Sequence, residues 1–151
     1  AGFALGAIPS ASPAYLPRQD RVMHIQDLHA APDDAVAQTA EVLRAGFLHI
    51  PDCWADPDEA LAEVRESLAT ERISRVAISG GDVVGWVGGI SEYDGHVWEL
   101  HPLVVRVDWR RRGVGRALLA DFEEQARLRG GMTVYLGSDD HTNQTSLGGL
   151  R

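Results

Sequence analysis

Residues 97–119 read VWELHPLVVRVDWRRRGVGRALL, and the rest of the chain can be placed around them. Residues 97–105 form a mostly apolar run with the length of a strand, and residues 106–109 make a short connection. Arginines and two glycines follow in residues 110–116, directly before an amphipathic run. The stretch therefore predicts a strand, a glycine-containing turn and the start of a helix.

The predicted turn has the chemistry of an anion site. Backbone N–H groups at a helix start lack helical acceptors, and the positive end of the helix dipole lies behind them. Glycines let the backbone approach a bulky anion, and arginines supply planar donors for phosphate oxygens. We therefore interpret the turn as a pyrophosphate site that comprises Arg110, Arg111, Arg112, Gly113, Val114, Gly115 and Arg116.

Other glycine-containing turns fit less well. A Walker A loop needs a lysine after its last glycine, and the chain contains no lysine. A dinucleotide-binding turn needs G-x-G-x-x-G, whereas Gly115 is followed by Arg116, Ala117 and Leu118. A solvated, arginine-rich helix start without a ligand stays open, because a lone pair of glycines is a weak signal.

Composition limits the kinds of partner. The chain has 151 residues, enough for one domain, and its net charge of -8 comes from 14 basic and 22 acidic residues. Such an acidic chain suits a cationic small molecule better than a nucleic acid. The single cysteine, Cys53, fits a reducing cytoplasm. No apolar run has the length of a membrane span, so no membrane partner is expected.

Periodicity and turn residues predict one domain over residues 21–151, after an extension at 1–20 that is rich in proline and small residues. Asp56 is expected to cap the second helix. The order is β-α-α-β-β-β-α-β, with the last strand parallel to its neighbour because a helix connects them. The expected elements are a strand at 21–26, a helix from 32 to 47, a helix at 57–68, strands at 75–79, 83–90 and 97–105, a helix at 113–129 and a strand at 132–136.

These motifs resemble those of a known family. Arg110-x-x-Gly113-x-Gly115 is similar to the R/Q-x-x-G-x-G/A loop that binds the acetyl-CoA pyrophosphate in the GNAT superfamily of N-acetyltransferases. VWELHPLVV and the later TVYLGSDD, residues 133–140, resemble strands of aminoglycoside 6′-N-acetyltransferases. The resemblance covers residues 23–147 and implies an α/β (α+β) fold with the mixed GNAT sheet. The C-terminal helix and strand pair of that fold are expected to be lacking.

The same resemblance implies how the strand at 97–105 would be used. In the family, a backbone N–H on this strand is left out of the sheet and donates to the developing oxyanion. Here that donor would be Leu103, and Leu103, Val104 and Val105 would bind acetyl-CoA together with the turn. Pro102 cannot donate to a sheet and independently marks a break in pairing, although it is also compatible with a simple edge or bulge.

Glu99 and His101 are polar residues in an apolar run. Strand alternation predicts that Glu99, His101 and Leu103 share one face. Ionisable groups on an inner strand are costly without partners or a cleft. We therefore interpret Glu99 as the residue that orients the acceptor ammonium and relays its proton, with His101 in support. A hydrogen-bonded polar pair at the end of the sheet is the alternative.

Aromatic and acidic residues elsewhere suit a polycationic acceptor through ion pairs and cation–π contacts. The candidates are Trp54, Tyr93, Asp139 and Asp140; the alternatives are a core position for Trp54 and an ordinary turn for the aspartates. The histidines show no metal-ligand spacing, so no metal is expected. The family's usual proton donor to the thiolate, a tyrosine on a later helix, has no counterpart among Tyr15, Tyr93 and Tyr135.

Together these features predict an enzyme that uses acetyl-CoA to acetylate a primary amine, with the 6′-amine of an aminoglycoside antibiotic as the leading acceptor. Another small amine, or a protein N-terminus, is the alternative acceptor. An acyl-CoA-binding protein without useful turnover is the alternative class, because the C-terminal elements are expected to be lacking. An exposed edge on the last strand further predicts self-association, so a homodimer is expected.

Overall fold

The structure is a computed structural model that describes residues 22–136. The extension at 1–20, Asp139 and Asp140 lie outside the described residues. The elements are β1 (His24–Asp27), η3 (Leu28–Ala30), α2 (Ala35–Gly46), α3 (Pro57–Glu66), β2 (Arg72–Ser79), β3 (Asp82–Glu92), η4 (Tyr93–Gly95), β4 (Val97–Val105), η5 (Val107–Trp109), α4 (Val114–Leu128) and β5 (Thr133–Leu136). The predicted order of helices and strands is confirmed.

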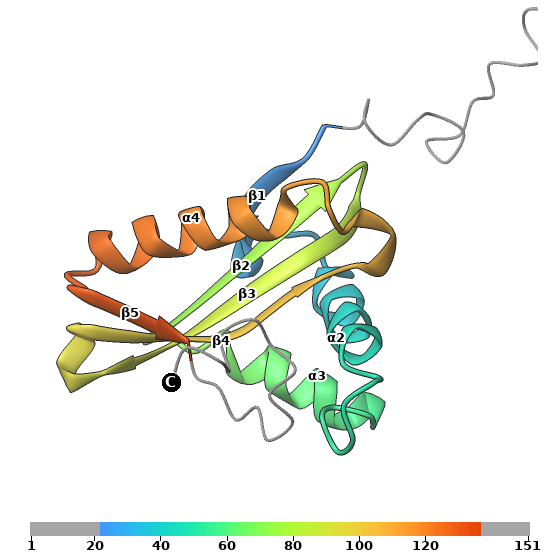
Figure 1. The fold of residues 1–151 in the computed structure, drawn as a ribbon, viewed down its shortest axis with the longest axis horizontal. Coiled ribbons are helices and arrows are strands. Elements are labelled where there is room, and N and C mark those ends of the chain that lie inside the picture. Colours follow the sequence, from blue (N-terminus) through green and yellow to red (C-terminus); the bar gives the residue numbers. More distant parts are fainter. Residues whose placement is uncertain (1–21, 137–151) are drawn as a thin grey trace, which may run out of the picture.

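The strands form one sheet in the order β1-β2-β3-β4-β5 (Figure 1). Neighbours are antiparallel from β1 to β4, and β5 is parallel to β4, as the intervening helix predicts. Within residues 22–136 no strand pairs with the outer edge of β5. The expected self-association through this edge stays a prediction.

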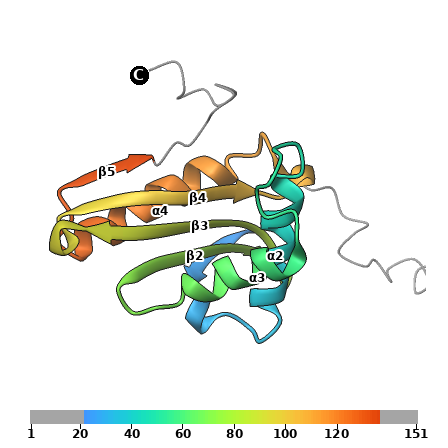
Figure 2. The same ribbon diagram turned by 90° about the horizontal axis from the view of Figure 1, so that it is seen from below.

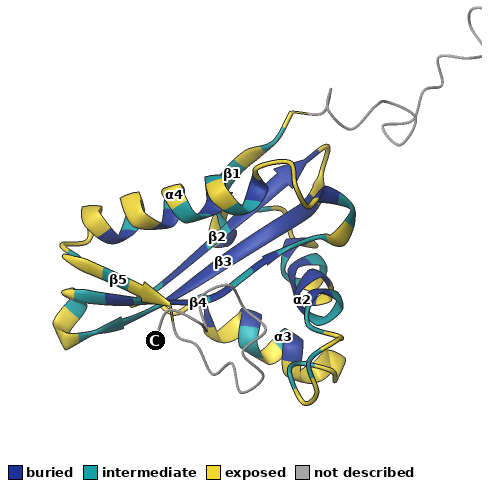
Figure 3. Ribbon diagram, viewed as in Figure 1, coloured by how far each residue is buried: buried dark blue, intermediate teal, exposed yellow. Residues whose placement is uncertain are grey.

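Helices cover both faces of the sheet. Helix α4 packs on one face, and α2 and α3 pack on the other (Figure 2). The amphipathic run expected after the turn forms α4, and its apolar stripe of Val114, Leu118, Phe122 and Ala126 is buried against the sheet. The central strands β2 and β3 are the most buried part of the molecule (Figure 3). None of the helices between residues 22 and 136 is long and apolar enough to cross a membrane.

The helices begin in two different ways. At α3 the carboxylate of Asp56 accepts a hydrogen bond from the N–H of Asp58, which is the predicted cap, and Pro57 occupies the first turn. At α4 the preceding residue is Gly113, and no side chain caps the helix. The start of α4 is therefore open to an external acceptor.

A β-bulge interrupts β4. Residues 87–89 of β3 lie opposite residues 100–103 of β4, so Gly88 faces both His101 and Pro102. A Cβ on Gly88 would lie only 2.7 Å from the carbonyl oxygen of His101. Glycine at this position therefore lets the bulge pack closely against β3.

The bulge changes which side chains share a face. Leu100 packs in the core under α4, and Val104, four residues later, packs in the core under α2 and α3. Leu103 contacts the α4-side core, whereas His101 contacts α3 on the opposite face. The prediction that Leu103 shares a face with Glu99 and His101 is therefore wrong, because the extra residue of the bulge reverses the alternation.

The strands β4 and β5 separate beyond the bulge. Residues 97–100 pair with residues 133–136, and the pairing ends at Leu100. In the described part of the chain, residues 103–105 have a partner strand on the β3 side only. A backbone edge of β4 is thus left available next to the start of α4.

Candidate active site

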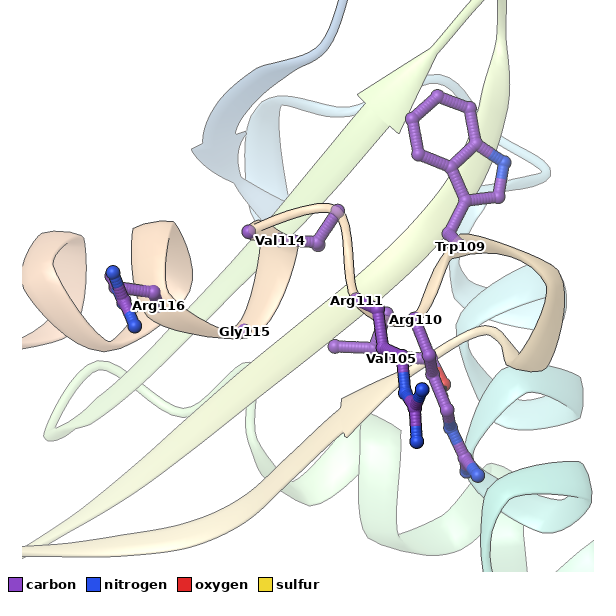
Figure 4. Close-up of a pocket in the computed structure, with 8 residues that line it drawn as sticks. Val105, Trp109, Arg110, Arg111, Val114, Gly115 and Arg116 are labelled. Atoms are coloured by element: carbon purple, nitrogen blue, oxygen red, sulfur yellow. Dashed lines mark hydrogen bonds between the residues drawn. The ribbon is translucent and has the colours of Figure 1, made fainter. Parts of the chain in front are cut away.

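A pocket of about 430 Å³ lies at the start of α4 (Figure 4). Its lining comprises Val105, Trp109, Arg110, Arg111, Gly113, Val114, Gly115 and Arg116. The first backbone hydrogen bond of α4 runs from the N–H of Ala117 to the carbonyl of Gly113, so the preceding N–H groups have no helical acceptor. Gly113 has a φ of 84°, in the left-handed region that glycine adopts without strain.

Arginine side chains surround this pocket. Those of Arg110 and Arg111 extend in the same direction, away from the Trp109 indole (Figure 4). The Nε of Arg110 lies 3.4 Å from the carbonyl oxygen of Val105, a long contact that ties the loop to the end of β4. Arg112 was predicted to bind the cofactor, and its guanidinium lies over the Trp109 ring, 5.9 Å from the centroid. Arg110 and Arg111 therefore line the pocket, whereas Arg112 does not.

The free edge of β4 leads into the pocket. The N–H of Arg106 donates to the carbonyl of Val84, across the β3 side of the strand. In an antiparallel pair, the N–H groups of successive residues point alternately to the two sides of the strand. The N–H groups of Leu103 and Val105 therefore point away from β3, to the unpaired side. The side chain of Val104 is buried under α2 and α3. This arrangement agrees with the predicted break in pairing beside Pro102.

These features fit an extended ligand with a pyrophosphate. Open N–H groups and two arginines lie at one end, where phosphate oxygens would bind. The unpaired N–H groups of β4 continue from there along the strand, suited to amide and carbonyl groups. A Cβ on Gly115 would meet only a methyl group of Val105, at 3.6 Å, so the backbone at this turn is not covered by other parts of the described chain.

His101 lies on the opposite face of β4, against α3. Its Nε2 lies 3.0 Å from the Oε1 of Glu63, and the side chains are 34% and 15% exposed, respectively. The hydrogen bond to Glu63 raises the pKa of His101 above that of a free imidazole, and the reciprocal contact lowers the pKa of Glu63. The pair is therefore an ion pair over a wider pH range than two isolated groups would be.

Trp54 completes this side of the site. Its ring centroid lies 5.7 Å from that of His101, and Phe47 packs edge-on against the indole at 4.9 Å. Trp54 is partly buried against the core, which agrees with the core alternative. Its role as an acceptor-binding residue stays a prediction. Glu63 is not among the residues predicted from the sequence, because nothing in the local pattern of α3 signals a contact with β4.

Glu99 lies two residues before His101 on β4 and opposite Tyr135 of β5. The hydroxyl of Tyr135 donates to Glu92 at 2.8 Å, and this hydrogen bond raises the pKa of Tyr135 to about 12. Tyr93 is 75% exposed and lies in η4, directly after Glu92. The structure thus places Tyr93 with Tyr135 and Glu92, at the start of β4. Among residues 22–136, no group of three histidine, cysteine or acidic side chains could hold a metal ion.

Comparisons with known proteins agree with this geometry. Residues 38–148 match the profile of the Acetyltransferase (GNAT) family. An aminoglycoside 6′-N-acetyltransferase solved with coenzyme A is 33% identical, with a TM-score of 0.69 over 82% of this chain and 69% of that one. An aminoglycoside 6′-acetyltransferase type Ii is 31% identical, with a TM-score of 0.70 over 82% and 77%.

The aminoglycoside 6′-N-acetyltransferase from Enterococcus faecium is 33% identical, with a TM-score of 0.68 over 82% of this chain and 69% of that one. A search of curated proteins finds no significant match. The fold, the open start of α4 and these comparisons lead to one conclusion: the chain belongs to the GNAT family of acetyl-CoA-dependent N-acetyltransferases.

Proposed function

We propose that the chain transfers the acetyl group of acetyl-CoA to the 6′-amine of an aminoglycoside. The observation that carries the proposal is the unpaired N–H of Leu103, which lies along β4 between the loop before α4 and the pair Glu99 and His101. The identity of 31–33% to three aminoglycoside 6′-acetyltransferases supports the choice of acceptor.

In this proposal the loop and the strand edge hold the co-substrate. The N–H groups at the start of α4, with Arg110 and Arg111, bind the pyrophosphate. Bound acetyl-CoA supplies an activated thioester. The amine nitrogen forms a bond to the thioester carbon, the carbon–sulfur bond breaks, and the thiolate leaves. The N–H of Leu103 donates to the carbonyl oxygen and stabilises the negative charge that develops on it.

Glu99 would prepare the amine for attack. An ammonium group must lose a proton before its nitrogen can react, and a carboxylate within reach directly or through one water can accept it. The described residues give Glu99 neither a hydrogen bond nor an ion pair, so its carboxylate is available to the acceptor. Trp54 offers an aromatic face to a cationic ring, and the net charge of -8 attracts a polycation.

The thiolate must gain a proton as it leaves. In the described part of the chain, Tyr93 and Tyr135 lie at the start of β4, whereas the loop before α4 follows its end. Neither tyrosine is therefore placed to protonate a thiolate beside Leu103. We assign that proton to water. We also propose that the protein acts in the cytoplasm, where Cys53 would stay reduced.

A matched pair of acceptors tests the proposal. Paromomycin carries a hydroxyl where neomycin carries its 6′-amine, and the two are otherwise the same. We expect thiol release from acetyl-CoA with neomycin and little with paromomycin. Equal rates with both would place transfer at another amine. If the protein acetylated a simple primary amine but neither antibiotic, the aminoglycoside would be excluded as the acceptor. The assignment as an acetyltransferase would still hold.

A further inference from the structure

The contact between Glu63 and His101 joins α3 to the bulge of β4. The Oε1 of Glu63 lies 3.0 Å from the Nε2 of His101, and the Glu63 side chain is only 15% exposed. A half-buried carboxylate is costly unless a partner satisfies it, so this contact is a specific one. It connects a helix that carries no other candidate residue to the strand that carries Glu99, His101 and Leu103.

His101 is held at three points. Its carbonyl packs against Gly88, where a Cβ would approach to 2.7 Å. One edge of its ring meets Glu63, and Trp54 lies beside the ring at 5.7 Å between centroids and an interplanar angle of 59°. Of these contacts, Glu63 makes the directional one. The orientation of the imidazole ring therefore depends on Glu63.

Charges from three elements act on the ring. They are Glu63 of α3, Glu99 of β4 and Arg72 of β2; the two carboxylates favour protonated His101, and Arg72 opposes it. Glu63 is paired with His101, whereas Glu99 has no ion-pair partner among residues 22–136. An acceptor ammonium is then attracted to Glu99 and not to Glu63.

We propose that Glu63 is a positioning residue for the acceptor site: its hydrogen bond to His101 fixes the imidazole beside Glu99 and ties α3 to the β4 bulge. The role within the site rests on the proposed function, because it assumes that the acceptor amine binds at Glu99. Glu63 does not touch the reacting atoms. It acts through His101 on acceptor binding and on the pH at which the site changes charge.

Glu63→Gln and Glu63→Ala test the inference, with Glu66→Gln as the matched control. Glu66 lies on the same helix and is exposed, so its substitution makes the same charge change away from His101. The first readout is the NMR titration of His101 without acceptor. We expect its pKa to fall in both Glu63 variants and to stay unchanged in Glu66→Gln.

The second readout is steady-state kinetics with neomycin across pH. In Glu63→Ala we expect the KM for neomycin to rise about tenfold, the scale of one hydrogen bond to a charged group, with the KM for acetyl-CoA unchanged. In Glu63→Gln, which retains a hydrogen-bonding side chain, we expect a smaller rise in KM. The limb of the pH–rate profile that belongs to His101 should move to lower pH in both variants.

Two results would overturn the inference. One is a His101 titration that does not change in Glu63→Ala, which would show that Glu63 does not control the ring. The other is a shifted titration with unchanged kinetics, which would make the pair purely structural. Failure of the proposed function can be told apart from failure of this inference. If the proposed function is wrong, the parent protein will not turn over neomycin. The titration of His101 still shows whether Glu63 controls the ring.

Discussion

Gly88 and His101 face each other so closely across β3 and β4 that a Cβ on Gly88 would lie 2.7 Å from the His101 carbonyl oxygen. The contact lies where Gly88 faces both His101 and Pro102. The bulge places His101 against α3 and turns Leu103 to the other face. The arrangement of the candidate site therefore depends on a glycine in a neighbouring strand.

Gly88→Ala should therefore displace the bulge. We expect a loss of about 1–3 kcal/mol in the free energy of unfolding, the usual cost of overpacking, and a disproportionate loss of acetyl transfer. Gly89→Ala on the same strand is the control, since its Cβ would press on Phe122 of α4 and on Ile73 of β2, in the core. Equal losses of activity in the two variants at matched stability would contradict the account.

Binding of CoA should depend on the backbone of Gly113. Gly113→Ala forces a side chain into a backbone conformation with a φ of 84°, which costs about 1–2 kcal/mol and shifts the N–H groups of the turn. Gly130→Ala imposes the same strain at the other end of α4, where φ is 87°. Calorimetry should show weaker CoA binding in Gly113→Ala only. Equal affinities in both would remove the pyrophosphate site from this loop.

Glu99→Gln should separate binding from chemistry. The variant keeps the shape of the side chain and loses the group assigned to accept the proton of the amine. We expect kcat/KM for an aminoglycoside to fall by roughly 10²–10⁴-fold, the range for general acid–base groups, with CoA affinity unchanged. Turnover at the parent rate would show that Glu99 is only a polar residue of the sheet.

The Glu63–His101 pair should make stability depend on pH. The pKa of His101 is raised on folding, so its contribution is complete below about pH 6.5, the unfolded value, and is lost as pH rises through the raised pKa. The pKa of Glu63 is lowered, so its contribution is complete above about pH 4.3 and is lost as pH falls through the lowered pKa. Both contributions to stability are complete only between about pH 4.3 and about pH 6.5.

The difference in unfolding free energy between the parent and Glu63→Ala should be largest in that interval. We expect about 1–2 kcal/mol there, since the pair is partly screened by water, and less at alkaline pH. Denaturant titrations at mildly acidic and alkaline pH measure it. A difference that does not change with pH would mean that Glu63 contributes by packing alone.

Much of the fold could be predicted from local pattern. The run Val97–Val105 is a strand with those bounds, Asp56 caps α3, and the apolar stripe of α4 is buried as its spacing requires. These features depend on periodicities and caps that involve neighbours in sequence. The same is true of the loop before α4, because its arginines and Gly113 are consecutive in the sequence, at residues 110–113.

The acceptor side was less predictable because its contacts are not local. Pro102 signals a break in pairing, but strand alternation alone places Leu103 on the same face as His101. The bulge that reverses the alternation is formed by two residues opposite Gly88, and this pairing is visible only in the folded sheet. Glu63 lies 38 positions before His101 (101 − 63), and their contact requires the packing of α3 on the sheet. Asp139 and Asp140 remain predictions, outside the described residues.

Mass spectrometry of kanamycin, after incubation with the protein and acetyl-CoA, tests most directly whether this site acetylates an aminoglycoside. We expect one added acetyl group, located by fragmentation on the 6′-amine, and its loss or strong reduction in Glu99→Gln. Kanamycin of unchanged mass, under conditions in which calorimetry shows that the protein is folded and binds CoA, would contradict the claim that this site acetylates an aminoglycoside.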